Sequence, residues 1–499
     1  MTKQILELAL KKTRPDKSLE QEIFSKWMVL SEEELKSLSQ IKRFKERYEA
    51  DPDFRKNITI EPEKTLARYN LKIDPEAIRW LLDKEFVESQ QVEGKPFPLS
   101  IQHYLDYNNA VTKWMRRWRD TTPDITFESD PRFRVWRERQ MARNDSEISK
   151  SGNAKIVHAP VCFELSKGCS VGCWFCGISA PRLGDIFYYS AENAKLWQEV
   201  LELMKEIVGA AAGSGFCYWA TDPFDNPDYE KFVSDFHEIL GVFPQTTTAQ
   251  SMKNPARTRS LLKLSATKGF THHRFSILSL KILDSLYEEF TPEELVHVGL
   301  VMQNKESLMN KALAGRALEK KQRKAHETNQ EADDELAQPT IACVTGFFFN
   351  MVERSVKLIS PCKASKRWPN GYKVYDEGTF ADINDLKVLL ERMITNHMPL
   401  SVRESDRIRF RRDLIHENLI DGFKLSTRFL TLKFRHRPLI KELGEVILKS
   451  NKTAQEIAIL FESLGVSTAD TFYSLNLMFQ RGVLDDDPPQ LSQFQSEKP

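Results

Sequence analysis

Several features that would place this chain in a particular class are missing or scarce. No apolar run is long enough to span a bilayer, and Met1 to Lys12 lack the apolar core of a signal peptide. Glycine and proline number only 20 and 23 among 499 residues, which argues against a fibrous or low-complexity chain. We therefore expect an ordered cytoplasmic protein of roughly two to four domains, with no membrane partner.

Charge of one sign is not in excess either. The chain has 72 basic and 71 acidic residues, and no large basic patch stands out. A nucleic-acid partner is therefore not expected. The chain also contains no Asp-x-His-x-x-Gly sequence, so nothing suggests a cobalamin domain.

Cysteines are few, and most of them are isolated. There are seven, and Cys162, Cys217, Cys343 and Cys362 lie far from one another, with no second Cys-x2-Cys pair. A zinc site usually takes four ligands from two such pairs, and a disulfide framework suits small secreted domains with an even number of cysteines. An auxiliary iron–sulfur cluster would also need its own grouped thiolates. The isolated cysteines support none of these.

The other three cysteines are grouped, and they are the most informative residues of the chain. Cys169, Cys173 and Cys176 form a Cys-x3-Cys-x2-Cys run within Lys-Gly-Cys-Ser-Val-Gly-Cys-Trp-Phe-Cys-Gly. Three thiolates in one loop can hold three irons of a cubane cluster and leave the fourth iron open. An open iron can bind a molecule that offers an amine and a carboxylate, as S-adenosylmethionine does. Chance clustering is the weaker interpretation.

The middle of the chain alternates strand and helix patterns. Helical spacing over Ala191 to Val208 and a proline-initiated helix from Pro255 to Lys268 separate apolar runs of strand length. This alternation predicts a parallel sheet. The six predicted strands are Val161–Leu165, Gly215–Ala220, Gln245–Ala249, His273–Leu278, Val296–Met302 and Thr340–Phe348.

The cysteine run, with Trp174 and Phe175 before its last cysteine, resembles the signature of the radical S-adenosylmethionine superfamily. The resemblance implies an α/β fold with a partial (β/α)6 barrel, whose site lies at the C-terminal ends of the strands. It also implies a [4Fe-4S] cluster on Cys169, Cys173 and Cys176. The residues implied to contact S-adenosylmethionine are Phe175, Thr221, Asp222 and Ser279.

Two of these assignments have structural alternatives. Many superfamily members carry Gly-Gly-Glu-Pro where this chain has Thr221, Asp222 and Pro223, so the match is inexact, and residues 225 to 228 are equally explained as a turn. Ser279 matches a serine that meets the ribose, but a serine that caps the next helix is the rival explanation.

Two further stretches, residues 217–230 and 353–369, resemble the radical peptide epimerases that mature proteusin-type ribosomal peptides. The resemblance implies an isomerase that converts L- to D-residues. A 5′-deoxyadenosyl radical takes an α-hydrogen, and a thiol returns one from the opposite face. In that family a cysteine after the sixth strand is the donor, and Cys362 matches its place. Cys162, Cys217 and Cys343 are expected to be core residues, whereas Cys362 is expected in a polar loop.

The C-terminal part is predicted to be a separate module. A strand-like stretch from Phe423 to Phe434 precedes three helical segments, the second of which has a capping-box pattern at Thr453 and Glu456. The order is winged-helix-like and resembles the leader-recognition domain of ribosomal-peptide modifying enzymes, in which the leader adds a strand to a sheet edge. A purely structural cap on the barrel is the alternative.

These patterns define the expected organisation and function. We expect a peptide epimerase whose partners are a leader-bearing precursor and an electron donor such as a flavodoxin or ferredoxin. The alternatives are another radical modification, a cross-link or C-methylation, and a peptide-binding adaptor with a structural cluster. The predicted parts are a helical region at 1–130, the barrel at 150–380, a helical connector at 381–420, the recognition module at 421–486 and a disordered tail at 487–499.

Overall fold

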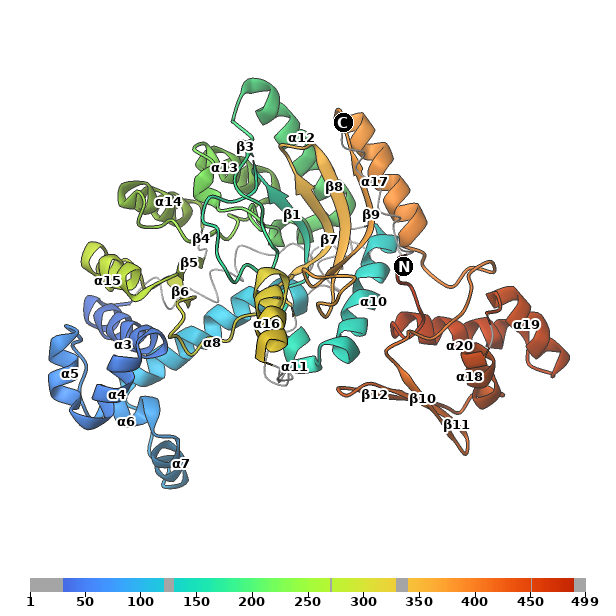
Figure 1. Ribbon diagram of the computed structural model, residues 1–499, viewed down its shortest axis with the longest axis horizontal. Coiled ribbons are helices and arrows are strands. Elements are labelled where there is room, and N and C mark those ends of the chain that lie inside the picture. The colour runs from blue at the N-terminus through green and yellow to red at the C-terminus, as the bar shows by residue number, and fades with distance from the viewer. Residues whose placement is uncertain (1–29, 121–129, 270–271, 329–339, 450, 489–499) are drawn as a thin grey trace, which may run out of the picture.

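A computed structural model describes residues 30–120, 130–269, 272–328, 340–449 and 451–488 of this chain. Helices at the N-terminal end, a central α/β part and a C-terminal module of strands and helices follow one another along the chain (Figure 1). None of the described helices is both long and apolar enough to cross a membrane. The mixed α/β class is confirmed, and the domain boundaries stay predictions.

The N-terminal region is helical wherever it is described. Ser31 and Glu34 form a capping box that starts the first helix, and Asp51 caps the second, which begins at Pro52. The helices are α3 (Glu32–Ala50), α4 (Pro52–Ile60), α5 (Pro62–Arg68), α6 (Ala77–Leu82), α7 (Lys84–Val92) and α8 (Leu99–Asp120). Residues 1–29 and 121–129 of the predicted helical region lie outside the described residues.

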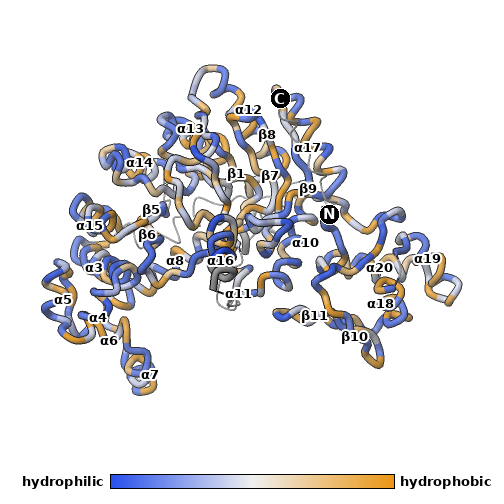
Figure 2. The backbone as a smooth tube through the Cα atoms, viewed as in Figure 1, coloured by the Kyte–Doolittle hydropathy of each residue, from blue (hydrophilic) through white to orange (hydrophobic). Residues whose placement is uncertain are grey.

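The main central sheet has the strand order β1-β7-β8-β9. Strands β1 (Ala159–Glu164) and β7 (Val344–Asn350) run parallel, whereas β8 (Ser355–Pro361) and β9 (Tyr372–Thr379) continue the sheet in antiparallel pairs. Figure 2 shows hydrophobic residues along β1 and β7, as expected of strands covered on both faces. One face of β1 carries Val161 and Phe163 into the core beneath the helices.

A second sheet of parallel strands contains β4 (Thr247–Thr248), β5 (His273–Ile277) and β6 (Val298–Met302). The predicted second strand appears only as a parallel bridge between Phe216 and Cys162 of β1. The parallel pairings are therefore confirmed. In a barrel whose strands follow the order of the chain, β7 would pair with β6, the strand before it. In this structure β7 pairs with β1 instead. The partial barrel stays a prediction.

Helices cover both sheets. Helix α12 matches its predicted bounds, and its Trp197 packs edge-on against Phe163 of β1. The helices of this part are α10 (Pro131–Glu147), α11 (Lys150–Asn153), α12 (Ala191–Val208), α13 (Tyr229–Leu240), α14 (Pro255–Lys268), α15 (Leu280–Glu289), α16 (Gly315–Thr328) and α17 (Ile383–His397).

The C-terminal module has three antiparallel strands followed by three helices. The capping box at Thr453 and Glu456 is confirmed. The stretch from Phe423 to Phe434, predicted as one strand, is a hairpin of two antiparallel strands. The turn at residues 427–430 was not predicted because it contains no glycine. The elements are β10 (Ile415–Leu419), β11 (Gly422–Ser426), β12 (Thr431–Arg435), α18 (Ile440–Lys449), α19 (Ala454–Ser463) and α20 (Thr468–Gln480). The winged-helix resemblance stays a prediction.

The chain after α20 returns to the central part. Arg143 of α10 forms ion pairs with both Asp486 and Asp487, and Lys373 of β9 lies 2.7 Å from Asp487. The prediction of a disordered tail from residue 487 is therefore wrong for Asp487, because buried cations hold its carboxylate in place. Residues 489–499 of that tail lie outside the described residues.

Candidate functional site

The three grouped cysteines lie on a loop that leaves the C-terminal end of β1. The short strands β2 (Ser166–Lys167) and β3 (Asp185–Ile186) pair at the base of this loop. Gly168 has a positive φ of +81°, and a Cβ there would come within 2.3 Å of the carbonyl oxygen of Arg182. Only glycine permits so close a contact, which fixes the start of the cysteine loop.

Asp225 ties the cysteine loop to the next strand end. Its carboxylate accepts hydrogen bonds from the backbone N–H of Ser170 at 2.9 Å and from the Ser170 hydroxyl at 2.5 Å. Gln250, which follows β4, donates to the same carboxylate at 2.7 Å. The sequence interpretation treated this residue as part of a turn. The acidic side chain one residue before Asn226-Pro227 was the signal that could have found it.

Arg316, the second residue of α16, holds the other side of the loop. Its backbone N–H donates to the carbonyl of Cys176, and its guanidinium donates to the carbonyl of Cys173, both at 3.0 Å. The preceding Gly315 has a φ of +51°, and a Cβ there would lie 2.6 Å from the Cys176 carbonyl oxygen. The start of α16 therefore positions the cysteine loop.

The loop supplies hydrogen-bond donors to two of its three sulfurs. The Val171 N–H lies 3.4 Å from Cys169 Sγ, and the Ala180 N–H lies 3.4 Å from Cys176 Sγ. Burial raises the pKa of Cys169 to about 12 and that of Cys173 to about 11, so both are thiols when no metal is bound. Backbone N–H groups stabilise the thiolate form that metal ligation requires.

The chemistry of these donors fits an iron–sulfur cluster. Among the described residues, however, no three or more Cys, His, Asp or Glu side chains are close enough to enclose a metal ion. A four-iron cluster takes each thiolate on a different iron, so its ligands need not surround one point. The cluster on Cys169, Cys173 and Cys176 therefore stays a prediction.

Two of the residues expected to contact S-adenosylmethionine, Asp222 and Ser279, already have hydrogen-bond partners within the protein. Asp222 accepts hydrogen bonds from Thr248, Ala249 and Phe224 at 2.7 to 3.0 Å, so each of its oxygens already has a protein partner. Ser279 accepts the Ile282 N–H and caps α15, as the rival interpretation stated.

The other two residues expected to contact S-adenosylmethionine are placed as follows. Thr221 is buried beside Asp222. Phe175 lies in the cysteine loop, with the Lys311 ammonium 5.6 Å from its ring centre. The structure shows where these side chains lie, and their contacts with S-adenosylmethionine stay predictions.

Glu164 is a buried acidic residue near the cysteine loop in sequence that the sequence interpretation did not single out. It is the last residue of β1, and its carboxyl accepts hydrogen bonds from the Ala220 N–H at 2.6 Å and from Asn350 of β7 at 3.0 Å. Burial raises its pKa to about 7. Strand alternation was the available signal, because it puts Glu164 on the face of β1 opposite Val161 and Phe163.

The interpretation of Cys362 as a thiol in a polar loop is wrong. Its side chain is 0% exposed, and its backbone N–H donates to Gly371 at 2.9 Å. Burial raises the pKa of the thiol, and the nearby Glu147 carboxylate raises it further. Cys362 follows β8, which runs against β1 and β7, so it lies at the edge where those strands begin. Cys343, which directly precedes β7, lies at the same edge, so Cys362 differs from it in burial rather than in position.

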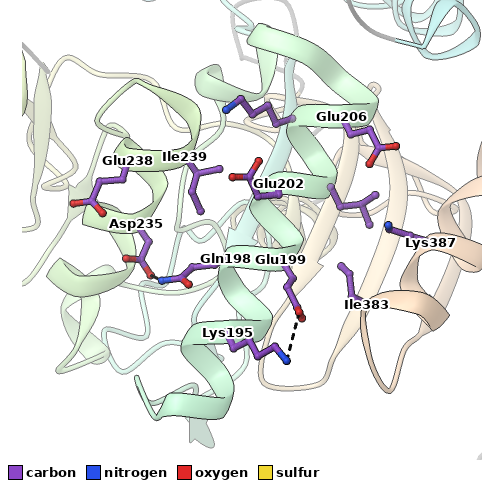
Figure 3. A pocket seen from close by; sticks show the side chains of 12 residues that line it. Lys195, Gln198, Glu199, Glu202, Glu206, Asp235, Glu238, Ile239, Ile383 and Lys387 are labelled. Carbon is purple, nitrogen blue, oxygen red and sulfur yellow. Dashed lines mark hydrogen bonds and ion pairs between the residues drawn. The ribbon is translucent and has the colours of Figure 1, made fainter.

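Two cavities differ sharply in chemistry. A groove of about 900 Å³ lies on the outer helices α12, α13 and α17. Charged side chains line it, and Lys195 and Glu199 pair with each other (Figure 3). Its described lining includes neither a cysteine nor a residue of the cysteine loop. A second cavity of about 510 Å³ lies beside the start of β7 and is lined by Cys343 and Arg274. We call this second cavity the basic cavity.

Comparison with known proteins identifies one long match. The chain is 37% identical over 462 residues to the uncharacterized protein y4wI of Sinorhizobium fredii (strain NBRC 101917 / NGR234), across 91% of this chain and 88% of that protein. No family model matches. The crystal structure of BtrN in complex with AdoMet and 2-DOIA is 15% identical over 30% of this chain and 56% of that chain, with a TM-score of 0.23. A TM-score this low does not establish a shared fold or function.

Proposed function

The chain belongs to the same family as the Sinorhizobium fredii protein y4wI, and we propose that it is a radical S-adenosylmethionine enzyme acting on peptides. One observation carries the proposal: the Cys-x3-Cys-x2-Cys loop stands at the C-terminal end of a parallel strand, where α/β enzymes place their sites. Asp225 and Arg316 hold that loop from two sides. A cytoplasmic location accompanies this proposal.

The proposed reaction is the conversion of L- to D-residues in a ribosomally made precursor. When bound, the cluster and S-adenosylmethionine supply the 5′-deoxyadenosyl radical that removes a peptide α-hydrogen. The protein must then return a hydrogen atom from the opposite face. A thiol S–H does this by giving up its hydrogen and becoming a thiyl radical. One electron from a flavodoxin or ferredoxin and one proton from solvent restore the thiol.

Cys343 is the thiol that best meets this requirement. Of the four cysteines outside the loop, Cys162 and Cys362 are 0% exposed and Cys217 is 1% exposed, whereas Cys343 is partly exposed and lines the basic cavity. Burial raises its pKa to about 11, so it carries a hydrogen at neutral pH. This assignment replaces Cys362 as the proposed donor.

The C-terminal module suits the recognition of a leader peptide. Among the described strands β12 pairs only with β11, so its other edge can accept a peptide strand. A groove of about 230 Å³ follows that edge, between β12 and α20. Lys433, Arg435, Arg437 and Arg481 line it, so an acidic leader is the complementary partner.

The test combines the full chain with S-adenosylmethionine, a reductant and the precursor peptide encoded beside its gene, in deuterated water. Each inverted residue gains one deuteron at its α-carbon, and hydrolysis followed by chiral analysis finds D-residues. Lost hydrogens or added methyl groups would indicate a cross-link or C-methylation instead. Absence of 5′-deoxyadenosine would support a peptide-binding adaptor.

A further inference from the structure

The basic cavity has an unbalanced charge. Four cations line it, namely Lys155, Arg274, Lys363 and Arg428, and Glu147 is the single carboxylate among its described lining residues. Glu147 already pairs with Arg143 at 3.2 Å and with Lys373 at 3.6 Å. None of the four cations forms an ion pair with a carboxylate of the described residues. The cavity therefore presents positive charge with no partner within the part of the chain described.

Arg274 is the cation held most firmly. It lies on β5, and its Nε donates to Thr247 at 3.1 Å while one Nη donates to the Tyr218 hydroxyl at 2.9 Å. Tyr218 is fixed in turn by Gln245 and Thr247, at 3.2 and 2.8 Å. These partners are neutral, so they orient the guanidinium without balancing its charge. A positioned guanidinium with free N–H groups is suited to a carboxylate or a phosphate.

The cavity touches both the cysteine loop and the C-terminal module. Ile341 lines it and also covers the cysteine loop, because a Cβ on Gly177 would lie 2.8 Å from its side chain. At another point the lining includes Arg428 and Phe429, in the turn between β11 and β12. Thr427 fixes that turn by donating to the Ser146 carbonyl at 2.6 Å. The turn of the C-terminal module therefore forms part of the cavity wall.

We infer that the basic cavity binds an acidic side chain of the peptide substrate, with Arg274 as its main partner. The peptide nature of the ligand rests on the proposed function, whereas the anionic group follows from the cavity itself. The volume of about 510 Å³ lies within the range of ordinary ligand sites. Cys343 in the same lining then faces the bound segment. Arg274 is assigned a binding and positioning role.

Cys343 provides a readout that needs neither cluster nor S-adenosylmethionine. The full chain is alkylated at mildly alkaline pH, and site-resolved mass spectrometry follows Cys343 in the presence of a blocked Ala-Glu-Ala peptide or its Ala-Gln-Ala twin. We expect the glutamate peptide to protect Cys343 at concentrations at least about tenfold lower, since a hydrogen bond between charged groups gives that factor. Equal protection by both peptides, or by neither, overturns the inference.

Variants identify the residue responsible. Arg274→Gln should bring the two peptides to the same affinity, and Arg274→Lys should keep part of the difference. Arg428→Gln, at the hairpin turn, should reduce the ratio by a smaller factor and serves if Arg274→Gln does not fold. Lys195→Gln in the outer groove is the matched control and should keep the wild-type ratio. An unchanged ratio in Arg274→Gln contradicts the assignment.

The same alkylation experiment with inorganic phosphate tests whether the cavity binds a phosphate rather than a carboxylate. Protection by phosphate without protection by the glutamate peptide would make the ligand a phosphate and overturn the peptide assignment. If the glutamate peptide protects Cys343 but the enzyme forms no 5′-deoxyadenosine, the binding site stands and the proposed function fails. The opposite result, catalysis without any preference for glutamate, rejects this inference alone.

Discussion

The cysteine loop and the surroundings of Cys362 place similar thiols in opposite environments. The three loop cysteines are partly exposed, and backbone N–H groups donate to two of their sulfurs. Asp225 and Arg316 hold the loop through hydrogen bonds. Cys362 is fully buried beside Arg143, Glu147 and Asp487. The first arrangement leaves sulfur available to a metal, whereas the second encloses it in ion pairs that join α10, β9 and the chain after α20.

The contrast shows why a cysteine in a polar stretch of sequence need not be accessible. Lys363, Lys366 and Arg367 follow Cys362 and suggest a solvated loop. Charged residues far away in sequence close over the thiol instead, and they balance each other's charge. Accessibility is a tertiary property, and only the grouped spacing of the loop cysteines carries functional information at the level of sequence.

The largest effect is expected in the cysteine loop. Cys169→Ala, Cys173→Ala and Cys176→Ala should each abolish the cluster, because every iron but one takes its protein ligand from this loop. Iron and sulfide analysis of anaerobically reconstituted protein measures this. Cys217→Ala, in the core, is the matched control and should keep full iron content. An intact cluster in any loop variant would remove the basis of the proposal.

The comparison between thiols can be tested next. Cys343→Ala should still cleave S-adenosylmethionine but form no D-residues, because the α-radical loses its hydrogen donor. Cys362→Ala should retain both activities, because its sulfur is sealed from the cavity. Chiral analysis of the precursor after reaction with each variant decides between them. Loss of D-residues in Cys362→Ala alone would restore Cys362 as the donor.

The ionic surroundings of Cys362 should matter for stability rather than for chemistry. Arg143→Leu leaves Glu147, Asp486 and Asp487 without their shared cation, so it should cost about 3 to 5 kcal/mol of unfolding free energy. Denaturant titration measures the cost. Arg259→Leu removes exposed pairs with Glu289 and Glu294 and should change stability too little to resolve. Equal effects of the two variants would mean that the buried cluster is not integral to the fold.

Glu164 should give the smallest effect, visible as a pH dependence. Its folded-state pKa is raised from 4.5 to about 7, so the folded protein keeps a proton that the unfolded chain releases. Stability should therefore fall as pH rises from about 4.5 to about 7, by about 3 kcal/mol. Glu164→Gln should remove this slope. The same pH profile in wild type and variant would show that Glu164 is not the group responsible.

Local patterns predicted much of the fold. The spacing of apolar residues gave α12 its bounds, and the Thr453 capping box located α19. Strand pairing was less accessible, because no local signal indicates that β7 joins β1 rather than β6. The order of Asp487 was missed for a similar reason. Its partners, Arg143 and Lys373, are on α10 and β9, more than a hundred residues earlier.

The candidate site divides in the same way. The three cysteines are predictable because the chemistry needs them in one loop. Arg316 and Asp225 are not, because each acts on that loop from a distant segment, largely through backbone groups that carry no sequence signal. Arg274 and Cys343 were assigned to strands, but only the packed structure shows that both face one cavity.

The most direct test of the central claim is the electron paramagnetic resonance spectrum of the reduced full chain, recorded with and without S-adenosylmethionine. An open iron predicts a single four-iron signal that changes when S-adenosylmethionine binds, accompanied by 5′-deoxyadenosine after turnover. A signal that S-adenosylmethionine leaves unchanged, or stoichiometric zinc in place of iron, would contradict the assignment of this chain to radical chemistry.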